Sequence, residues 1–185
     1  MRLPDVNIKA AAVAAIVVVL ALFAGSSAYY RFGVFAPVGR AMAEIPEVRS
    51  YHVKRINGGI LVTVRLAGVS DLGDTVEKIS LATSRANRTN SVWLAMEEHA
   101  DPAIARAVHE LDFWVHEALV TGRFTQLARA STLIRSSEGL DRCDVSIDGG
   151  YIYVSMTNDG TEFYRIIPRQ EGQNIVSPSE RGVRI

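Results

Sequence analysis

Three side chains in one helical stretch have the chemistry of metal ligands. His109, Asp112 and His116 follow at spacings of three and four residues, which places them on one face of a helix. Imidazole and carboxylate groups suit zinc or iron. The two histidines are two turns apart, about 10.5 Å at 1.5 Å per residue, so one ion reaches both only if the helix bends. This face is a candidate metal site, with a solvated or capping flank and a pH-responsive patch as the other interpretations.

Motifs for nucleophilic or phosphate chemistry are missing from the sequence. Phe113 stands where an HExxH zinc helix has its second histidine, and no GxSxG nucleophile elbow is present. Gly58-Gly59 and Gly149-Gly150 lie between strand-like segments, whereas a phosphate loop leads from a strand into a helix. We therefore expect no catalytic residues and no cofactor.

The lone cysteine and the aromatic residues have structural and functional interpretations. Cys143 cannot form an internal disulfide, and neighbouring Arg142 could lower its thiol pKa, but no histidine is close in sequence. We predict a semi-buried strand residue. Tyr151 and Tyr153 lie on one face of a predicted strand, as part of an aromatic set. Core or cross-strand pairing is our interpretation, with a ligand platform as the alternative.

The composition predicts a folded chain without a nucleic-acid partner. Of the 185 residues, 48% are hydrophobic and 22% charged, which is typical of a globular domain. The formal net charge is zero, so the basic surface that nucleic acids require is missing.

An uncharged apolar run covers residues 10–30, between Lys9 and Arg31. As a helix it is about 31 Å long, which matches a bilayer core of about 30 Å. Tyr29 and Tyr30 occupy the place of interfacial aromatic residues. The run predicts a single-pass anchor in the cell membrane, with the lipid bilayer as its partner.

A cleaved signal peptide is the alternative for the same run. Arg2 and Lys9 form a basic n-region, and Ser26-Ser27-Ala28 offers small residues for cleavage. The basic residues on the two sides of the run are nearly balanced. Because a short basic tail usually stays inside, we expect the soluble domain to be extracytoplasmic.

Periodicity in the remaining chain predicts an α+β fold, with antiparallel hairpins packed on helices. Asn57-Gly58-Gly59 separates two strand-like segments, as in a type I′ hairpin. Asp74 and Glu77 resemble a capping box that opens a helix, and Asp101-Pro102 opens the clearest helix, which Gly122 ends or bends. The predicted helices are 38–45, 74–86, 101–122 and 124–135, and the predicted strands are 48–56, 60–66, 91–96, 143–147, 151–156 and 162–167. The order is αββαβ and then ααβββ.

Two hairpins repeat one local pattern. Residues 53–64 read VKRINGGILVTV and residues 144–156 read DVSIDGGYIYVSM. The likeness follows from restricted turn chemistry, or from two copies of a helix-plus-hairpin unit. We divide the chain into a tail (1–9), the anchor or signal peptide (10–30), a connector (31–37), a soluble domain (38–167) of one or two modules (38–98 and 101–167), and a flexible tail (168–185).

The α-β-β-α-β order over residues 38–96 resembles the small ring-building modules of secretion and sporulation assemblies, and the related BON-type envelope domain. That resemblance implies a membrane-tethered, non-enzymatic module that forms oligomers by side-to-side packing. It rests on element order and carries over no functional residue. We expect a membrane-tethered interaction or scaffold module of the cell envelope, with a second copy or an envelope protein as partner. The alternative is an extracytoplasmic small-molecule or metal-binding sensor domain.

Overall fold

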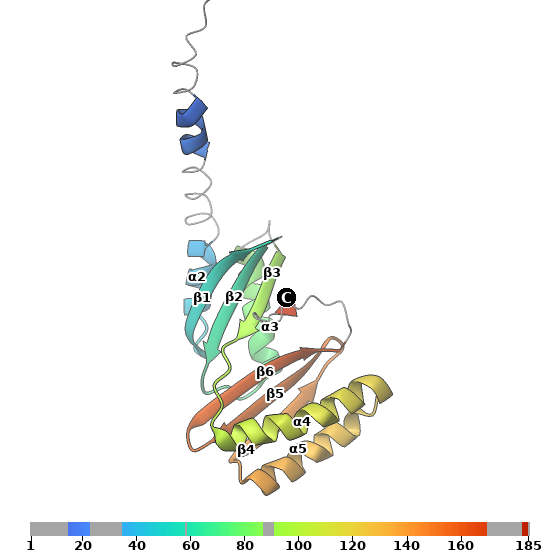
Figure 1. The fold of residues 1–185 in the computed structure, drawn as a ribbon. Coiled ribbons are helices and arrows are strands. Elements are labelled where there is room, and N and C mark those ends of the chain that lie inside the picture. Colours follow the sequence, from blue (N-terminus) through green and yellow to red (C-terminus); the bar gives the residue numbers. More distant parts are fainter. Residues whose placement is uncertain (1–14, 23–34, 58, 87–90, 170–182, 185) are drawn as a thin grey trace, which may run out of the picture.

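The computed structural model describes residues 15–22, 35–57, 59–86, 91–169 and 183–184 (Figure 1). Two groups of elements follow each other along the chain. The first module contains α2 (Ala36–Ala43), β1 (Val48–Ile56), β2 (Gly59–Leu66), α3 (Leu72–Ala86) and β3 (Ser91–Met96). The second contains α4 (Pro102–Thr121), α5 (Phe124–Glu138), β4 (Arg142–Ile147), β5 (Tyr151–Asn158) and β6 (Thr161–Pro168). The predicted α+β class and element order are confirmed.

The first sheet has the strand order β1-β2-β3-β7, in which β7 is Val183–Arg184. The predicted β1–β2 hairpin is confirmed, with Ile56 opposite Gly59, and Gly58 of its turn lies outside the described residues. β3 runs parallel to β2, so the chain crosses over through α3. Alternate residues of β2, such as Ile60 and Val62, are fully buried in one core with α2 and α3. The period-two pattern of β2 thus marks the face that the helices cover.

The second sheet is an antiparallel meander in the order β4-β5-β6. Helices α4 and α5 lie side by side on the face turned away from the first sheet (Figure 1). Asp101 caps α4 through a 2.8 Å hydrogen bond from the Ile104 amide, and Gly122 ends it at φ 72°. Both helix-end predictions are confirmed. The N-cap carboxylate and the left-handed glycine each satisfy backbone groups that a helix end leaves without a partner.

The segment between β2 and α3 joins the two modules. Glu162 of β6 accepts hydrogen bonds from the Gly68 amide at 3.0 and 3.1 Å. Arg142 of β4 donates to the carbonyl oxygens of Val69 and Ser70, both at 2.8 Å. Tyr164 accepts a bond from the Val69 amide at 3.2 Å, and its ring belongs to the core of the first module. The second sheet is therefore covered on both faces.

The glycine-containing turns of the second module differ in geometry. Asp159 and Gly160 have φ values of 46° and 76°, as the two central residues of a type I′ turn require. At the β4–β5 turn, the Asp148 carboxylate accepts bonds from the Gly150 and Tyr151 amides, both at 2.7 Å. That is an Asx-type turn, in which a side chain replaces part of the backbone ladder.

Several predicted segments lie wholly or partly outside the described residues. Within the part of the chain that is described, no helix combines the length and the apolar character that a membrane crossing needs. Of the predicted anchor, residues 15–22 are described, and they are helical. Of the predicted flexible tail, Val183–Arg184 form β7 and pair with β3, which departs from the prediction. Two residues are too few for a period-two signal, and β3 supplies the edge on which they pair.

Candidate functional site

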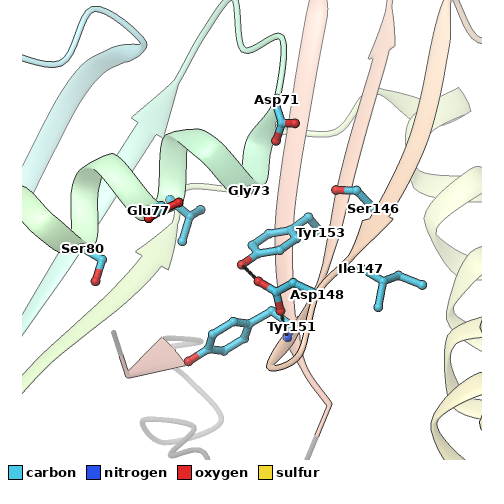
Figure 2. Close-up of a pocket in the computed structure, with 10 residues that line it drawn as sticks. Asp71, Gly73, Glu77, Ser80, Ser146, Ile147, Asp148, Tyr151 and Tyr153 are labelled. Atoms are coloured by element: carbon cyan, nitrogen blue, oxygen red, sulfur yellow. Dashed lines mark hydrogen bonds between the residues drawn. The ribbon is translucent and has the colours of Figure 1, made fainter.

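A pocket of about 550 Å³ lies between α3 and the β4–β5 hairpin, where the two modules face each other (Figure 2). Its size is within the usual range for small-molecule sites, about 300–1,000 Å³. Its two walls come from segments about 70 positions apart in the chain. The α3 wall consists of Asp71, Gly73, Val76, Glu77 and Ser80, and the hairpin wall of Ser146, Ile147, Asp148, Tyr151 and Tyr153.

The α3 wall is set by the position at which the helix begins. Gly73, Val76, Glu77 and Ser80 follow at i, i+3, i+4 and i+7, so they share one face. The cap is Asp71, whose Oδ1 accepts the Asp74 amide proton at 3.0 Å. The prediction that Asp74 opens the helix is therefore wrong. Two patterns of Asp followed three residues later by an acid overlap here, one from Asp71 and one from Asp74. The helix starts at the earlier pattern, and this start places Leu72 in the core.

Asp148 organises the hairpin wall. Besides the two turn amides, its Oδ2 accepts the Tyr153 hydroxyl proton at 2.7 Å (Figure 2). Burial acts to raise the pKa of this carboxyl, but the bonds from Tyr153, Tyr151 and Gly150, together with nearby Arg169, outweigh it and lower the pKa. Asp148 therefore stays negatively charged at the tip of the hairpin.

Two tyrosines give the pocket an aromatic side. The rings of Tyr151 and Tyr153 are 6.2 Å apart between centroids and tilted by 54°. Burial raises the pKa of both hydroxyls, and in Tyr153 the bond to Asp148 raises it further. Both phenols are therefore neutral at physiological pH. The ring of Tyr153 is 3.5 Å from where a Cβ on Gly73 would lie, so the α3 wall and this ring are in close contact.

The pocket is acidic. Asp71, Glu77 and Asp148 contribute carboxylates, and none of the described residues that line it is Lys, Arg or His. Lys78, the neighbouring cation on α3, pairs with Asp74 at 2.8 Å and with Glu47 at 3.4 Å. Among the described residues, no three His, Cys, Asp or Glu side chains lie close enough together to hold a metal ion. The arrangement is suited to a ligand larger than an ion, with positive charge and an apolar part.

The residues predicted as a metal site do not meet at one point. Asp112 accepts a hydrogen bond from Arg165 at 3.2 Å, and Arg165 also binds Glu98. His109 makes an edge contact with the ring of Phe113, at 5.2 Å between centroids. His109 and His116 are exposed. The helix stays regular, so the two-turn separation between the histidines is kept.

Cys143 is buried in the core of the second module. Burial raises the pKa of its thiol to about 11, and the Asp144 carboxylate acts in the same direction. The idea that Arg142 activates this thiol is wrong, because the guanidinium binds two carbonyl oxygens of the first module and Asp144.

Sequence reasoning found one part of the pocket and missed the rest. The sequence predicts Tyr151 and Tyr153 on one strand face, and the structure places both in the lining. Asp71, Glu77 and Asp148 were missed as site residues. The spacing of Gly73, Val76, Glu77 and Ser80 was a usable signal for a shared helix face. No local signal connects that face with the hairpin, because their contact depends on how the modules pack.

Comparisons with known proteins give no relative from which a role could be inferred. No family model, no curated protein and no solved structure matches the chain.

Proposed function

We propose that the chain is a single-pass, membrane-tethered interaction or scaffold module of the cell envelope, without catalytic activity. One observation carries the tether. Residues 15–22 form a helix whose large apolar side chains are 56% to 69% exposed: Ile16, Val17, Val18, Val19, Leu20 and Leu22. Such a helix is unfavourable in water, and a bilayer removes that cost. The uncharged run over 10–30 has the length for one crossing.

Helix α2 supports this proposal because it begins at Ala36, soon after the run, and packs into the core of the first module. Val38 and Met42 of α2 are fully buried in the core of the first module. Gly39 lies against Tyr51 of β1, and a Cβ there would meet the Tyr51 hydroxyl at 2.8 Å. A tether ending at α2 would hold the first module close to the membrane.

Strand β1 supports the interaction role. It is an outer strand, and among the described strands β2 is its one neighbour. Its nine residues are mostly exposed. An outer strand of this length can accept a further strand through its backbone groups. The partner we propose is a second copy of the chain or another envelope protein, and the domain lies outside the cytoplasm.

A small-molecule sensor is the second candidate, and the acidic pocket is the observation that favours it. The pocket lies between α3, which packs on α2, and the hairpin of the second module. A ligand that contacts both walls would change how firmly the two modules hold each other. Such a change would alter the packing of α3 on α2, and α2 lies next to the proposed tether.

Membrane fractionation of cells that express the full chain tests the tether. We expect the chain in the membrane pellet after extraction at alkaline pH, with an intact N-terminus by mass spectrometry. External protease should digest residues 36–185 in spheroplasts. A Val17→Arg/Val19→Arg variant should leave the pellet, whereas the matched Arg106→Ala/Arg129→Ala variant of the soluble part should stay. A soluble chain cut after Ala28 would establish the signal peptide and contradict the tether.

A further inference from the structure

The acidic pocket has a lining that specifies a ligand class. We propose that it binds a small organic cation carrying primary ammonium or guanidinium groups. This inference goes beyond the proposed function, and its test in detergent solution is independent of whether the chain is anchored or cleaved.

Charge is the first argument. The chain has no net charge, yet the described lining contains three carboxylates and no basic residue. Arg169, beside the hairpin, donates to the carbonyl oxygen of Asp148 and lies over the Phe124 ring at 4.4 Å, so it offsets part of the Asp148 charge. Asp71 and Glu77 on the opposite wall are then the main anionic groups for a ligand. A negative concavity concentrates cations near its walls.

Shape is the second argument. The pocket is about 550 Å³, and its carboxylates are spread over two walls. Among the described residues they form no group able to hold a single metal ion. An elongated molecule with a charge at each end could contact both walls, whereas a bare ion could contact one. This geometry favours an organic cation over a metal.

The aromatic side is the third argument. A cation over the face of a tyrosine ring is attracted by the ring's electrons, and methylene groups pack against the same face. Tyr151 offers a half-buried, neutral ring on the hairpin wall, 6.2 Å from the buried ring of Tyr153, and Val76 adds an apolar residue on the α3 wall. Serine hydroxyls from Ser80 and Ser146 add hydrogen-bond acceptors. The lining thus combines the groups that hold an alkyl ammonium.

The test is calorimetric titration of the full chain, in a non-ionic detergent, with spermidine as the probe and 1,8-octanediol as the uncharged control. We expect saturable spermidine binding that weakens on going from 0.01 M to 0.15 M salt, because the Debye length falls from about 30 to 8 Å. We expect no saturable binding of octanediol. Equal binding of the two probes, or no spermidine binding, would overturn the proposal.

Charge-removal variants locate the binding. Asp71→Asn keeps the helix cap, since asparagine caps as well as aspartate. Glu77 is an exposed residue of the α3 wall, so its substitution leaves the core unchanged. The Asp71→Asn/Glu77→Gln variant should bind spermidine about tenfold more weakly. Each exposed ion pair that is lost lowers the affinity by up to about fivefold, and this variant loses two. The Glu110→Gln/Glu117→Gln variant carries the same charge change on α4 and should bind like the wild type. Equal loss in both variants would show general attraction without a site.

Ring substitutions test the hairpin wall separately. Tyr151→Leu should weaken spermidine binding about threefold, within the range for a cation over an exposed ring, and Tyr151→Phe should retain it. If Tyr151→Phe and Tyr151→Leu bind equally well, the ring takes no part and the aromatic argument fails.

Discussion

The two hairpins have closely similar sequences around their turns and opposite surroundings. In β1–β2, a Cβ on Gly59 would lie 2.0 Å from the carbonyl oxygen of Ser91 and 2.5 Å from the Trp93 ring. In β4–β5, a Cβ on Gly149 would meet no atom within 4 Å. The first glycine lies against the parallel strand β3, whereas the second is at an open tip beside the pocket.

The same sequence motif therefore stands in two different environments, and a side chain is excluded at Gly59 but not at Gly149. In the first module Gly59 lets β3 pair closely beside the hairpin, because no side chain fits at that position. In the second module the turn is organised by the Asp148 carboxylate, and the chain continues into β6 antiparallel to β5. Both modules contain a helix followed by a hairpin. The third strand of the first module, β3, runs parallel to its neighbour β2, whereas that of the second, β6, runs antiparallel to β5.

The largest expected effect comes from the two glycines. Gly59→Ala should destabilise the protein by about 3 kcal/mol or more, because backbone must move to make room. Gly149→Ala should stay within about 1 kcal/mol of the wild type. Thermal unfolding of the full chain in detergent, followed by circular dichroism, measures both. Similar losses in the two variants would mean that the hairpins have equivalent environments.

A second expectation concerns the contact between the modules. Arg142→Met removes two 2.8 Å bonds to carbonyl oxygens of the first module and should cost about 2 kcal/mol. It should also broaden unfolding or split it into two transitions. The control is Arg106→Met, which breaks an exposed ion pair with Glu138 inside the second module and should cost about 0–1 kcal/mol. If Arg142→Met leaves one sharp, unshifted transition, Arg142 does not couple the modules.

The α3 wall of the pocket supplies a third, smaller effect. Asp71→Ala should destabilise the protein by about 1 kcal/mol through loss of the cap, and Asp71→Asn by a few tenths. Asp74→Ala should have the weaker effect of losing an exposed ion pair with Lys78. Chemical denaturation compares the three variants. A greater loss for Asp74→Ala than for Asp71→Ala would place the helix start at Asp74 after all.

The hairpin wall supplies the smallest effect, a dependence on pH. The folded pKa of Asp148 is lowered, so its stabilising contribution is complete above its ordinary value near 3.8 and is lost as the pH falls through the lowered value. The Tm advantage of the wild type over Asp148→Asn should therefore shrink between pH 5 and pH 2. An advantage that stays constant across this range would mean that the charge of Asp148 does not support the turn.

Local signals in the sequence were sufficient for most elements. The alternation of Ile60, Val62 and Val64 indicated β2, and Asp101 and Gly122 marked both ends of α4. These signals work because each depends on residues within one or two turns of chain. The parallel pairing of β2 with β3 had no such signal, because it depends on α3 packing across the sheet. For the same reason the pocket was not predicted as a unit, since its walls meet only after the modules pack.

The proposed interaction role leads to the most direct measurement, which again contrasts the two modules. A photo-reactive amino acid at Ser50 of β1, in cells that express the full chain, should give a discrete covalent adduct with a second copy or an envelope protein. The same amino acid at Leu133, an exposed position of α5, is the comparison. An adduct formed from Ser50 and not from Leu133 is the predicted result. No adduct from Ser50, or identical adducts from both positions, would contradict a role for β1 in partner binding.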